Sequence, residues 1–171
     1  MPQQDFISPA QSVTRTVTYD QKELYRFLRK WLSERHYLIN EKEYTERVGP
    51  EGKRMFVFTW MADKKLDDYT KAVLEVSVRS ITEDVKVELH DGKKKTAQKG
   101  DVSGSFRAFI LKDYEDEWTL KKKPVPLRVL REMYDKMVLK GTFARHQAHL
   151  KKDYNALMSD FKTYLSTHKY D

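Results

Sequence analysis

The 171-residue sequence contains no cysteine and no long uninterrupted run of apolar residues. Without cysteine the chain forms no disulfide and offers no thiolate, so a reducing cell interior suits it. A membrane-spanning helix needs about 18 consecutive apolar residues, and no segment approaches that length. The start, MPQQDFISPAQS, has no basic leader followed by an apolar core. We therefore expect no secretion signal, no transmembrane segment and a cytoplasmic location.

Glycine-based motifs of catalysis and nucleotide binding are also missing. The sequence has no G-x-x-x-x-G-K-[ST] loop, no G-x-G-x-x-G loop and no G-x-S-x-G turn. Nucleotide binding by these loops and catalysis by a serine on such a turn are therefore unsupported. No residue pattern selects a reaction, so we expect a non-catalytic protein without a cofactor.

The composition is that of a folded domain with a moderate excess of basic residues. Hydrophobic residues make up 39% of the chain and aromatic residues 12%, which is enough to build one core. The 33 Lys and Arg outnumber the 26 Asp and Glu, giving a net charge of +7. An excess of this sign attracts polyanions such as RNA, although basic runs in loops are more often simply solvated.

The N-terminal third predicts an arm, a strand and a helix. Residues 1–11 contain two prolines and no periodic pattern, which predicts a flexible arm before a single domain at 12–171. From Ser12 onward, valine and threonine dominate an alternating pattern typical of a strand. Asp20 and the following apolar stripe predict a capped helix over residues 21–35.

The middle of the chain changes to a period of two. LINEKEYTERV and RMFVFTWMA flank the turn cluster at 49–52 and predict a hairpin. YTKAVLEVSVRSI and TEDVKVELH alternate in the same way up to a tight turn at Asp91 and Gly92. After a polar linker, KKKTAQKG, the segment DVSGSFRAFILKDY predicts the last strand, in which Gly104 indicates a bend or bulge. Together these segments predict a curved antiparallel sheet of about five to six strands.

Two helices are predicted to close the chain. The first covers residues 127–140, with an apolar stripe that includes Leu130, Met133 and Met137, and stops at Gly141. In the second, apolar residues recur at steps of three and four from Phe143 to Leu165.

The stretch FARHQAHL places two histidines on this last helix. His146, His149 and Asp153 have the spacing i, i+3, i+7, which would allow all three to face one metal ion. However, His146 shares the apolar stripe, and Lys151 and Lys152 bring like charge to the same place. We therefore interpret the pair as packing residues and expect no metal site.

Two further segments carry side chains typical of functional sites. The acidic run at 113–117 offers carboxylates for acid–base work or for a hard cation, but charged loops are common where a strand ends. Phe56, Phe58 and Trp60 alternate on a strand beside basic residues, as in a base-stacking platform. Alternate aromatic residues on a strand more often form a core face, and we favour that interpretation.

The order of these elements, an α+β arrangement with a long C-terminal helix against a curved sheet, resembles the helix-grip fold of START and SRPBCC-type ligand-binding proteins. The likeness covers residues 12–166 and lies in element order alone. It departs from that family in having one helix between the first two strands and an extra helix at 127–141. The resemblance implies a cavity between the sheet and the last helix, either open to an apolar molecule or filled by side chains.

Three functions are compatible with these predictions. The first is a binding domain for an apolar small molecule, with a cavity lined by Phe56, Phe58, Trp60, Phe106, Leu157 and Phe161. The second is a basic accessory protein of RNA or of a ribonucleoprotein such as the ribosome, acting through Lys93, Lys94, Lys95, Lys121, Lys122, Lys123, Lys140, Arg145, Lys151 and Lys152. The third is a structural or oligomerisation role for the long C-terminal helix, in a monomer or a homodimer.

Overall fold

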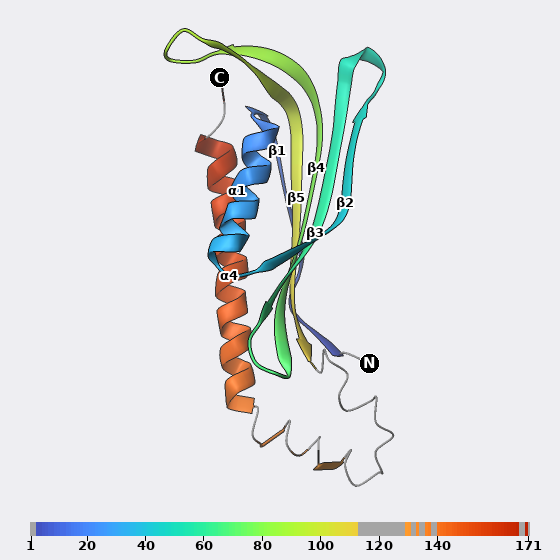
Figure 1. Cartoon of the computed structure of the whole chain (residues 1–171), viewed down its shortest axis with the longest axis vertical. Coiled ribbons are helices and arrows are strands. Elements are labelled where there is room, and N and C mark those ends of the chain that lie inside the picture. Colours follow the sequence, from blue (N-terminus) through green and yellow to red (C-terminus); the bar gives the residue numbers. More distant parts are fainter. Residues whose placement is uncertain are drawn as a thin grey trace.

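The computed structural model of the chain describes residues 3–112, 129–130, 133, 136–137, 140–167 and 170. Within these residues, five antiparallel strands form one open sheet, and two helices lie along the same face of it (Figure 1). The fold is therefore α+β, as predicted, and the sheet has five strands where five to six were predicted. None of the described helices is both long enough and apolar enough to span a membrane.

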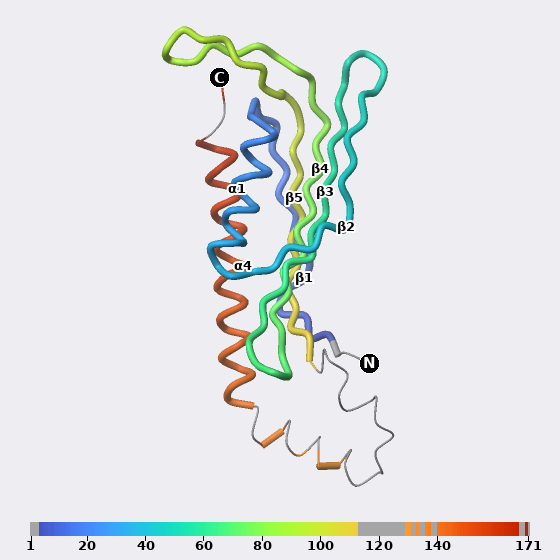
Figure 2. Tube along the Cα trace, in the orientation of Figure 1, coloured from blue at the N-terminus to red at the C-terminus, as the bar shows by residue number. Residues whose placement is uncertain are grey.

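The strands and helices have the following bounds: β1 Gln3–Tyr19, α1 Gln21–Glu34, β2 Leu38–Val48, the short 3-10 turn η1 Pro50–Gly52, β3 Lys53–Lys65, β4 Thr70–Glu88, β5 Lys94–Lys112 and α4 Lys140–Thr167. In the sheet their order is β1-β5-β4-β3-β2. In Figure 2 the chain leaves α1 and crosses the face of the sheet as β2 begins, so that β1 and β2 lie at opposite edges.

Helix α1 confirms the helix predicted for residues 21–35. The carboxylate of Asp20 accepts hydrogen bonds from the backbone N–H groups of Lys22 (2.9 Å) and Glu23 (3.1 Å), which satisfies donors that have no partner inside the helix. At the other end, His36 takes a left-handed conformation (φ 63°), which reverses the chain toward β2.

The sheet confirms the hairpin predicted around residues 49–52 and the turn at Gly92, whose φ is 79°. The two alternating segments before this turn form the single strand β4. The prediction that KKKTAQKG is a linker is wrong, because Lys94 to Gly100 form the first part of β5 and pair with β4. Polar residues are tolerated in this segment, because most side chains at this end of the β4–β5 hairpin are exposed or half-buried.

The first strand begins nine residues before the predicted start at Ser12, so the arm predicted at 1–11 is corrected from Gln3 onward. Three contacts hold this part of β1: an ion pair between Asp5 and Lys112 (2.7 Å), a ring contact between Phe6 and Phe109 (5.4 Å), and a hydrogen bond from the Tyr154 hydroxyl to the Pro9 carbonyl (3.3 Å). Register shifts on both sides of Ser8 accommodate the proline, which an edge strand tolerates.

Helix α4 confirms the long C-terminal helix and buries its apolar stripe on the chain's own sheet. The buried side chains are Leu150, Tyr154, Leu157, Met158, Phe161, Tyr164 and Leu165. Each contributes about 1.5–3 kcal/mol by leaving water. The stripe, which the third functional alternative would use to pair with another helix, thus packs on the chain's own sheet.

The helix predicted for 127–140 lies largely outside the described residues. Its described members are helical, and Leu130, Met133 and Met137 of its apolar stripe are exposed. Helix α4 already includes Lys140 and Gly141, so the predicted stop at Gly141 is wrong. A glycine within a helix costs only about 1 kcal/mol, which the burial farther along α4 outweighs.

Gly104 brings the sheet and α4 into direct contact. The pairing of β5 continues through Gly104 on both sides without a register shift, so the predicted bulge is absent there. A Cβ atom at this position would lie 2.7 Å from the Phe161 ring and 2.9 Å from the Phe106 ring. A glycine is needed because Phe161 occupies the space that any side chain would fill.

We predict that Gly104→Ala lowers the free energy of unfolding by roughly 1–3 kcal/mol, because the added methyl group forces Phe161 away from the sheet. The double variant Gly104→Ala/Phe161→Leu should recover part of the loss. Gly141→Ala is the matched control: nothing lies within 4 Å of that Cβ position, and alanine favours the helix. Urea unfolding measures all three; equal effects of the two single substitutions would contradict the close contact.

Candidate binding groove beside helix α1

The described residues form a groove between the first turns of α1 and the strands beside them. One hollow, of about 170 Å³, is lined by Gln21, Lys22, Tyr25, Arg26, Tyr44, Glu46 and Phe56. The second, of about 420 Å³, is lined by Asp20, Gln21, Lys22, Glu46, Arg54, Asp84, Lys95, Thr96 and Gln98. Because they share Gln21, Lys22 and Glu46, we treat them as the aromatic half and the polar half of one groove.

The aromatic half is built by the register of the β2–β3 hairpin. Tyr44 pairs with Phe58 and Glu46 with Phe56, which places all four side chains on the face that carries the helices. Phe56 and Phe58 are buried, whereas Tyr44 is 53% exposed. Tyr25 of α1 meets the Tyr44 ring edge-on, with the ring centroids 6.1 Å apart. The hairpin therefore carries one accessible aromatic ring next to a buried aromatic cluster.

Glu41 fixes Tyr25 relative to the sheet. One carboxylate oxygen of Glu41 accepts hydrogen bonds from the Trp60 indole N–H (2.9 Å) and from the Tyr25 hydroxyl (2.7 Å). These bonds, first that of Trp60 and then that of Tyr25, hold the pKa of Glu41 below its ordinary value. The negative charge of Glu41 thus links α1 to both strands of the hairpin.

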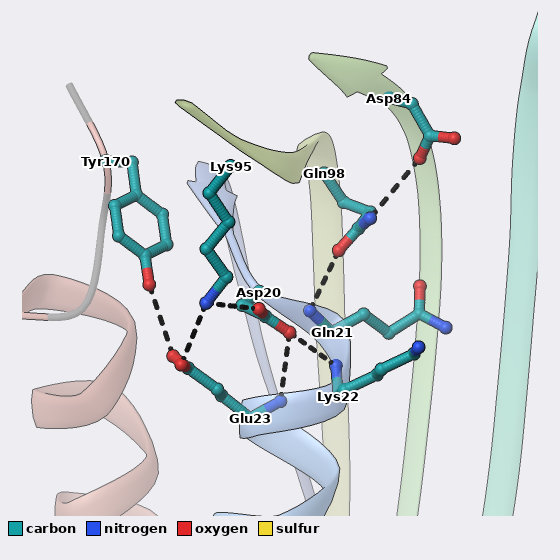
Figure 3. Close-up of polar contacts among 8 residues, drawn as sticks. All are labelled: Asp20, Gln21, Lys22, Glu23, Asp84, Lys95, Gln98 and Tyr170. Atoms are coloured by element: carbon teal, nitrogen blue, oxygen red, sulfur yellow. Dashed lines mark hydrogen bonds and ion pairs between the residues drawn. The ribbon is translucent and has the colours of Figure 1, made fainter. Parts of the chain in front are cut away.

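The polar half is organised by Lys95 (Figure 3). Its ammonium group lies 2.6 Å from an Asp20 oxygen and 2.9 Å from a Glu23 oxygen, and these two hydrogen bonds raise the pKa of Lys95. Burial alone would raise the pKa of Asp20, but bonds from Lys95 and from the first amides of α1 lower it. The Tyr170 hydroxyl also donates to Glu23 (3.2 Å), and the Lys95 ammonium group lies 5.6 Å from the centroid of the Tyr170 ring, so Lys95 and Glu23 join β5, α1 and Tyr170.

A second chain of contacts runs along the opposite side of the polar half. The Gln98 side chain accepts a hydrogen bond from the Gln21 backbone N–H (2.9 Å) and donates one to Asp84 (3.3 Å). Arg54 lies 3.0 Å from Asp84 and 3.2 Å from Glu46. Every carboxylate that lines the groove is thus paired with a basic side chain.

Lys22 and Arg26 are the exposed cations of the groove. In the part of the chain that the structure describes, neither side chain makes an ion pair, and both are exposed. Figure 3 shows the Gln21 and Lys22 side chains extending together, away from Tyr170 and Lys95. The charge that the groove offers to a ligand is therefore positive.

The six residues predicted to line an apolar cavity come together, but in contact with one another. Phe56, Phe58, Trp60, Phe106, Leu157 and Phe161 are all buried. Ring centroids lie 4.6 Å apart for Phe58 and Trp60 and 5.1 Å apart for Phe106 and Phe161. Of the six, only Phe56 also lines the groove. Whether this cluster holds a ligand stays a prediction.

The basic residues predicted to contact RNA divide into four groups. Lys95 is engaged with Asp20 and Glu23, because it faces α1 from within β5 rather than standing in a loop. Lys93 lies in the turn before β5, Lys94 is the first residue of β5, and both are exposed. Lys121 to Lys123 lie outside the described residues. The four predicted basic residues on α4 are all exposed, namely Lys140, Arg145, Lys151 and Lys152.

The sequence interpretation missed the basic face of α1. Lys22, Arg26, Arg29 and Lys30 are exposed on the side of this helix opposite its buried Leu24, Leu28 and Leu32. Lys162 of α4 was missed too, and it is exposed as well. The helical period that identifies the apolar stripe of α1 also predicts this face, whereas runs of adjacent lysines indicate only the loops.

The two histidines of FARHQAHL contact different carboxylates. The His146 ring lies 3.0 Å from Asp67, in the turn between β3 and β4. His149 lies 3.9 Å from Asp153, which accepts a hydrogen bond from the Tyr37 hydroxyl (2.8 Å). Among the described residues, no three metal-ligating side chains cluster as they would around an ion. The acidic run at 113–117 falls outside these residues.

Comparison with protein-family models gives no match for this chain, and a search of curated proteins gives none either.

We predict that Lys95→Met lowers the free energy of unfolding at neutral pH by about 1–2 kcal/mol, because Asp20 and Glu23 lose their shared partner. The lowered pKa of Asp20 stabilises the folded state. This stabilisation is complete when the pH is above 3.8, the ordinary pKa of the group, and it is lost as the pH falls through the lower pKa that Asp20 has in the folded protein. The difference between the two proteins should therefore be constant above about pH 5 and shrink in acid.

The matched control is Lys93→Met, since the Lys93 side chain is 81% exposed and lies 3.8 Å from Asp91. An exposed pair of this kind contributes under about 1 kcal/mol, so the control should unfold nearly as the parent does. Urea unfolding between about pH 3 and pH 8 measures both effects. A Lys95→Met difference that does not change in acid would contradict the role of Asp20.

Proposed function

We propose that this protein is a non-catalytic RNA-binding protein in which α1 and α4 contact the phosphate backbone. The observation that carries the proposal is the separation of charge between the two layers. The exposed charged side chains of α1 and α4 include nine basic residues and one acidic residue, Glu34. Those of the five strands include nine basic and seven acidic residues. Both helices lie on the same side of the sheet (Figure 1), so their exposed residues form one basic layer.

The remaining carboxylates of the helices are less accessible than the basic side chains. Asp160 accepts a hydrogen bond from the Trp31 indole N–H (2.7 Å), and Asp153 accepts one from the Tyr37 hydroxyl. Glu23 is paired with Lys95. Each of these acidic groups is half-buried and turned toward a neighbouring element, which leaves the lysine and arginine side chains to face solvent.

Phosphate is the anion that suits this layer, and a nucleic acid suits it better than a membrane. A helix that lies on a membrane inserts an apolar face between the lipids. The apolar faces of α1 and α4 are already buried on the sheet, and none of the large exposed apolar side chains of the described residues belongs to either helix. Charged side chains without apolar neighbours are typical of backbone contacts to nucleic acid.

The apolar-ligand hypothesis and the helix-grip likeness are supported by the long helix laid against an antiparallel sheet. We rank them second because Gly104 and Phe161 already touch where that helix crosses the sheet. A ligand at this place would have to separate the two layers.

We predict that the protein binds single-stranded RNA with an affinity that falls roughly 10²–10³-fold between 50 and 200 mM salt, as expected for about six phosphate contacts. Lys151→Glu/Lys152→Glu should weaken binding by tenfold or more at about 100 mM salt and make the salt dependence shallower. Fluorescence anisotropy with a labelled oligonucleotide measures both quantities.

The matched control is Lys86→Glu/Lys99→Glu, which makes the same change of charge on exposed residues of β4 and β5. It should retain affinity within about threefold, since only long-range attraction changes. Equal losses in the two double variants would show attraction to net charge alone and would contradict a binding face on the helices. Binding to anionic phosphatidylserine vesicles but not to RNA would replace the proposal with a membrane surface.

A further inference from the structure

We infer that the aromatic half of the groove takes one unpaired nucleobase of the bound strand, stacked on Tyr44. The inference rests on the proposed function and names what the groove adds to it. It gives the protein a preference for single-stranded over double-stranded RNA, because a base in a duplex is not free to enter the groove.

The first support is continuity of charge between the basic layer and the groove. Lys22 and Arg26 are two of the exposed basic residues of α1, and both also line the aromatic half. A phosphate backbone that follows α1 therefore passes the rim of the groove. No other part of the basic layer combines exposed cations with an exposed aromatic ring in the described residues.

The second support is the state of the Tyr44 ring. Its contacts with Tyr25 and Phe56 are both edge-on, at interplanar angles of 84° and 85°, so neither neighbour stacks flat on it. The Tyr44 hydroxyl is neutral at physiological pH, because its ordinary pKa is 10.0 and burial, followed by the charges of Glu46 and Glu41, raises it further. Its exposed surface is thus suited to stacking on a base.

The third support is the size and rigidity of the hollow. At about 170 Å³ it is smaller than the roughly 300–1,000 Å³ of sites for drug-sized molecules, and it suits a single planar group. Tyr25 is held in place by its hydrogen bond to Glu41 (2.7 Å), so one wall is fixed before a ligand arrives.

The fourth support is a polar group that can meet the edge of a base. The Gln21 side chain lines both halves of the groove, and its amide makes no hydrogen bond with the described residues. An amide offers a donor and an acceptor side by side, which is the pattern that base edges match.

The test compares variants of Tyr44 on single-stranded oligoadenosine and on a blunt RNA duplex of the same length, at equal salt. Tyr44→Ala should weaken binding of the single strand roughly 5- to 150-fold and leave binding of the duplex unchanged. Tyr44→Phe should bind both as the parent does, since the ring is retained. Phe6→Ala is the matched control, because Phe6 is 55% exposed but lies on β1 at the far edge of the sheet and should not change either affinity.

A direct readout of stacking is the fluorescence of 2-aminopurine placed in the single strand. Fluorescence should be quenched on binding to the parent and to Tyr44→Phe, and much less on binding to Tyr44→Ala. Unchanged single-strand affinity and unchanged quenching in Tyr44→Ala would overturn the inference, as would an equal loss on the duplex. If at the same time Lys151→Glu/Lys152→Glu still weakens binding, the proposed function stands; if the parent binds no RNA, the proposed function and the inference both fail.

Discussion

The contact between Phe161 and Gly104 sets the distance between α4 and the sheet, and much of the structure depends on that distance. With no side chain at residue 104, the helix approaches β5 and its neighbour β1 closely and buries seven side chains against the sheet. Once α4 is seated, its residues Asp153 and Asp160 reach hydrogen-bond donors on the chain segment from α1 to β2. The packing of one ring against one glycine thus also determines which side chains of the helices face solvent.

The charge of the surface follows from this packing. A carboxylate that accepts a hydrogen bond from tryptophan or tyrosine is held against its neighbour, and a lysine or arginine with a long apolar stem extends into water more readily. The helices therefore expose mostly cations even though their sequences contain both signs. The strands, in contrast, expose both signs, and several of their charges meet across adjacent strands, as Glu75 and Arg107 do. The net charge of +7 is a property of the whole chain, but its excess lies largely on the helical layer.

The sequence was sufficient for the elements that have a clear period. Helix α1, β3 and the apolar stripe of α4 followed from local pattern, because the buried side chains of each lie on one face. The β2–β3 hairpin followed from the turn residues at 49–52, since β2 itself has no buried side chain. The sequence was not sufficient for Gln3 to Gln11, since this segment is a strand only through partners distant in the chain, such as Lys112 for Asp5. It was not sufficient for Lys94 to Gly100 either, because this segment pairs with the neighbouring β4 but carries mostly polar residues without an apolar alternation. The groove was not predicted at all. It needs Tyr25 from α1 and Tyr44 from β2 side by side, and no local pattern reports that proximity.

The position of Tyr170 has a mechanical consequence. Its backbone N–H donates to the Thr18 carbonyl (2.8 Å), near the end of β1 that is opposite Gln3. A force applied between Gln3 and Tyr170 therefore acts along β1, a strand of 17 residues and roughly 55 Å. The hydrogen bonds between β1 and β5 run across that direction, so the force loads them together in shear instead of opening them one after another. Pulled in this way, the molecule should resist extension far more strongly than when β2 is peeled from the other edge of the sheet.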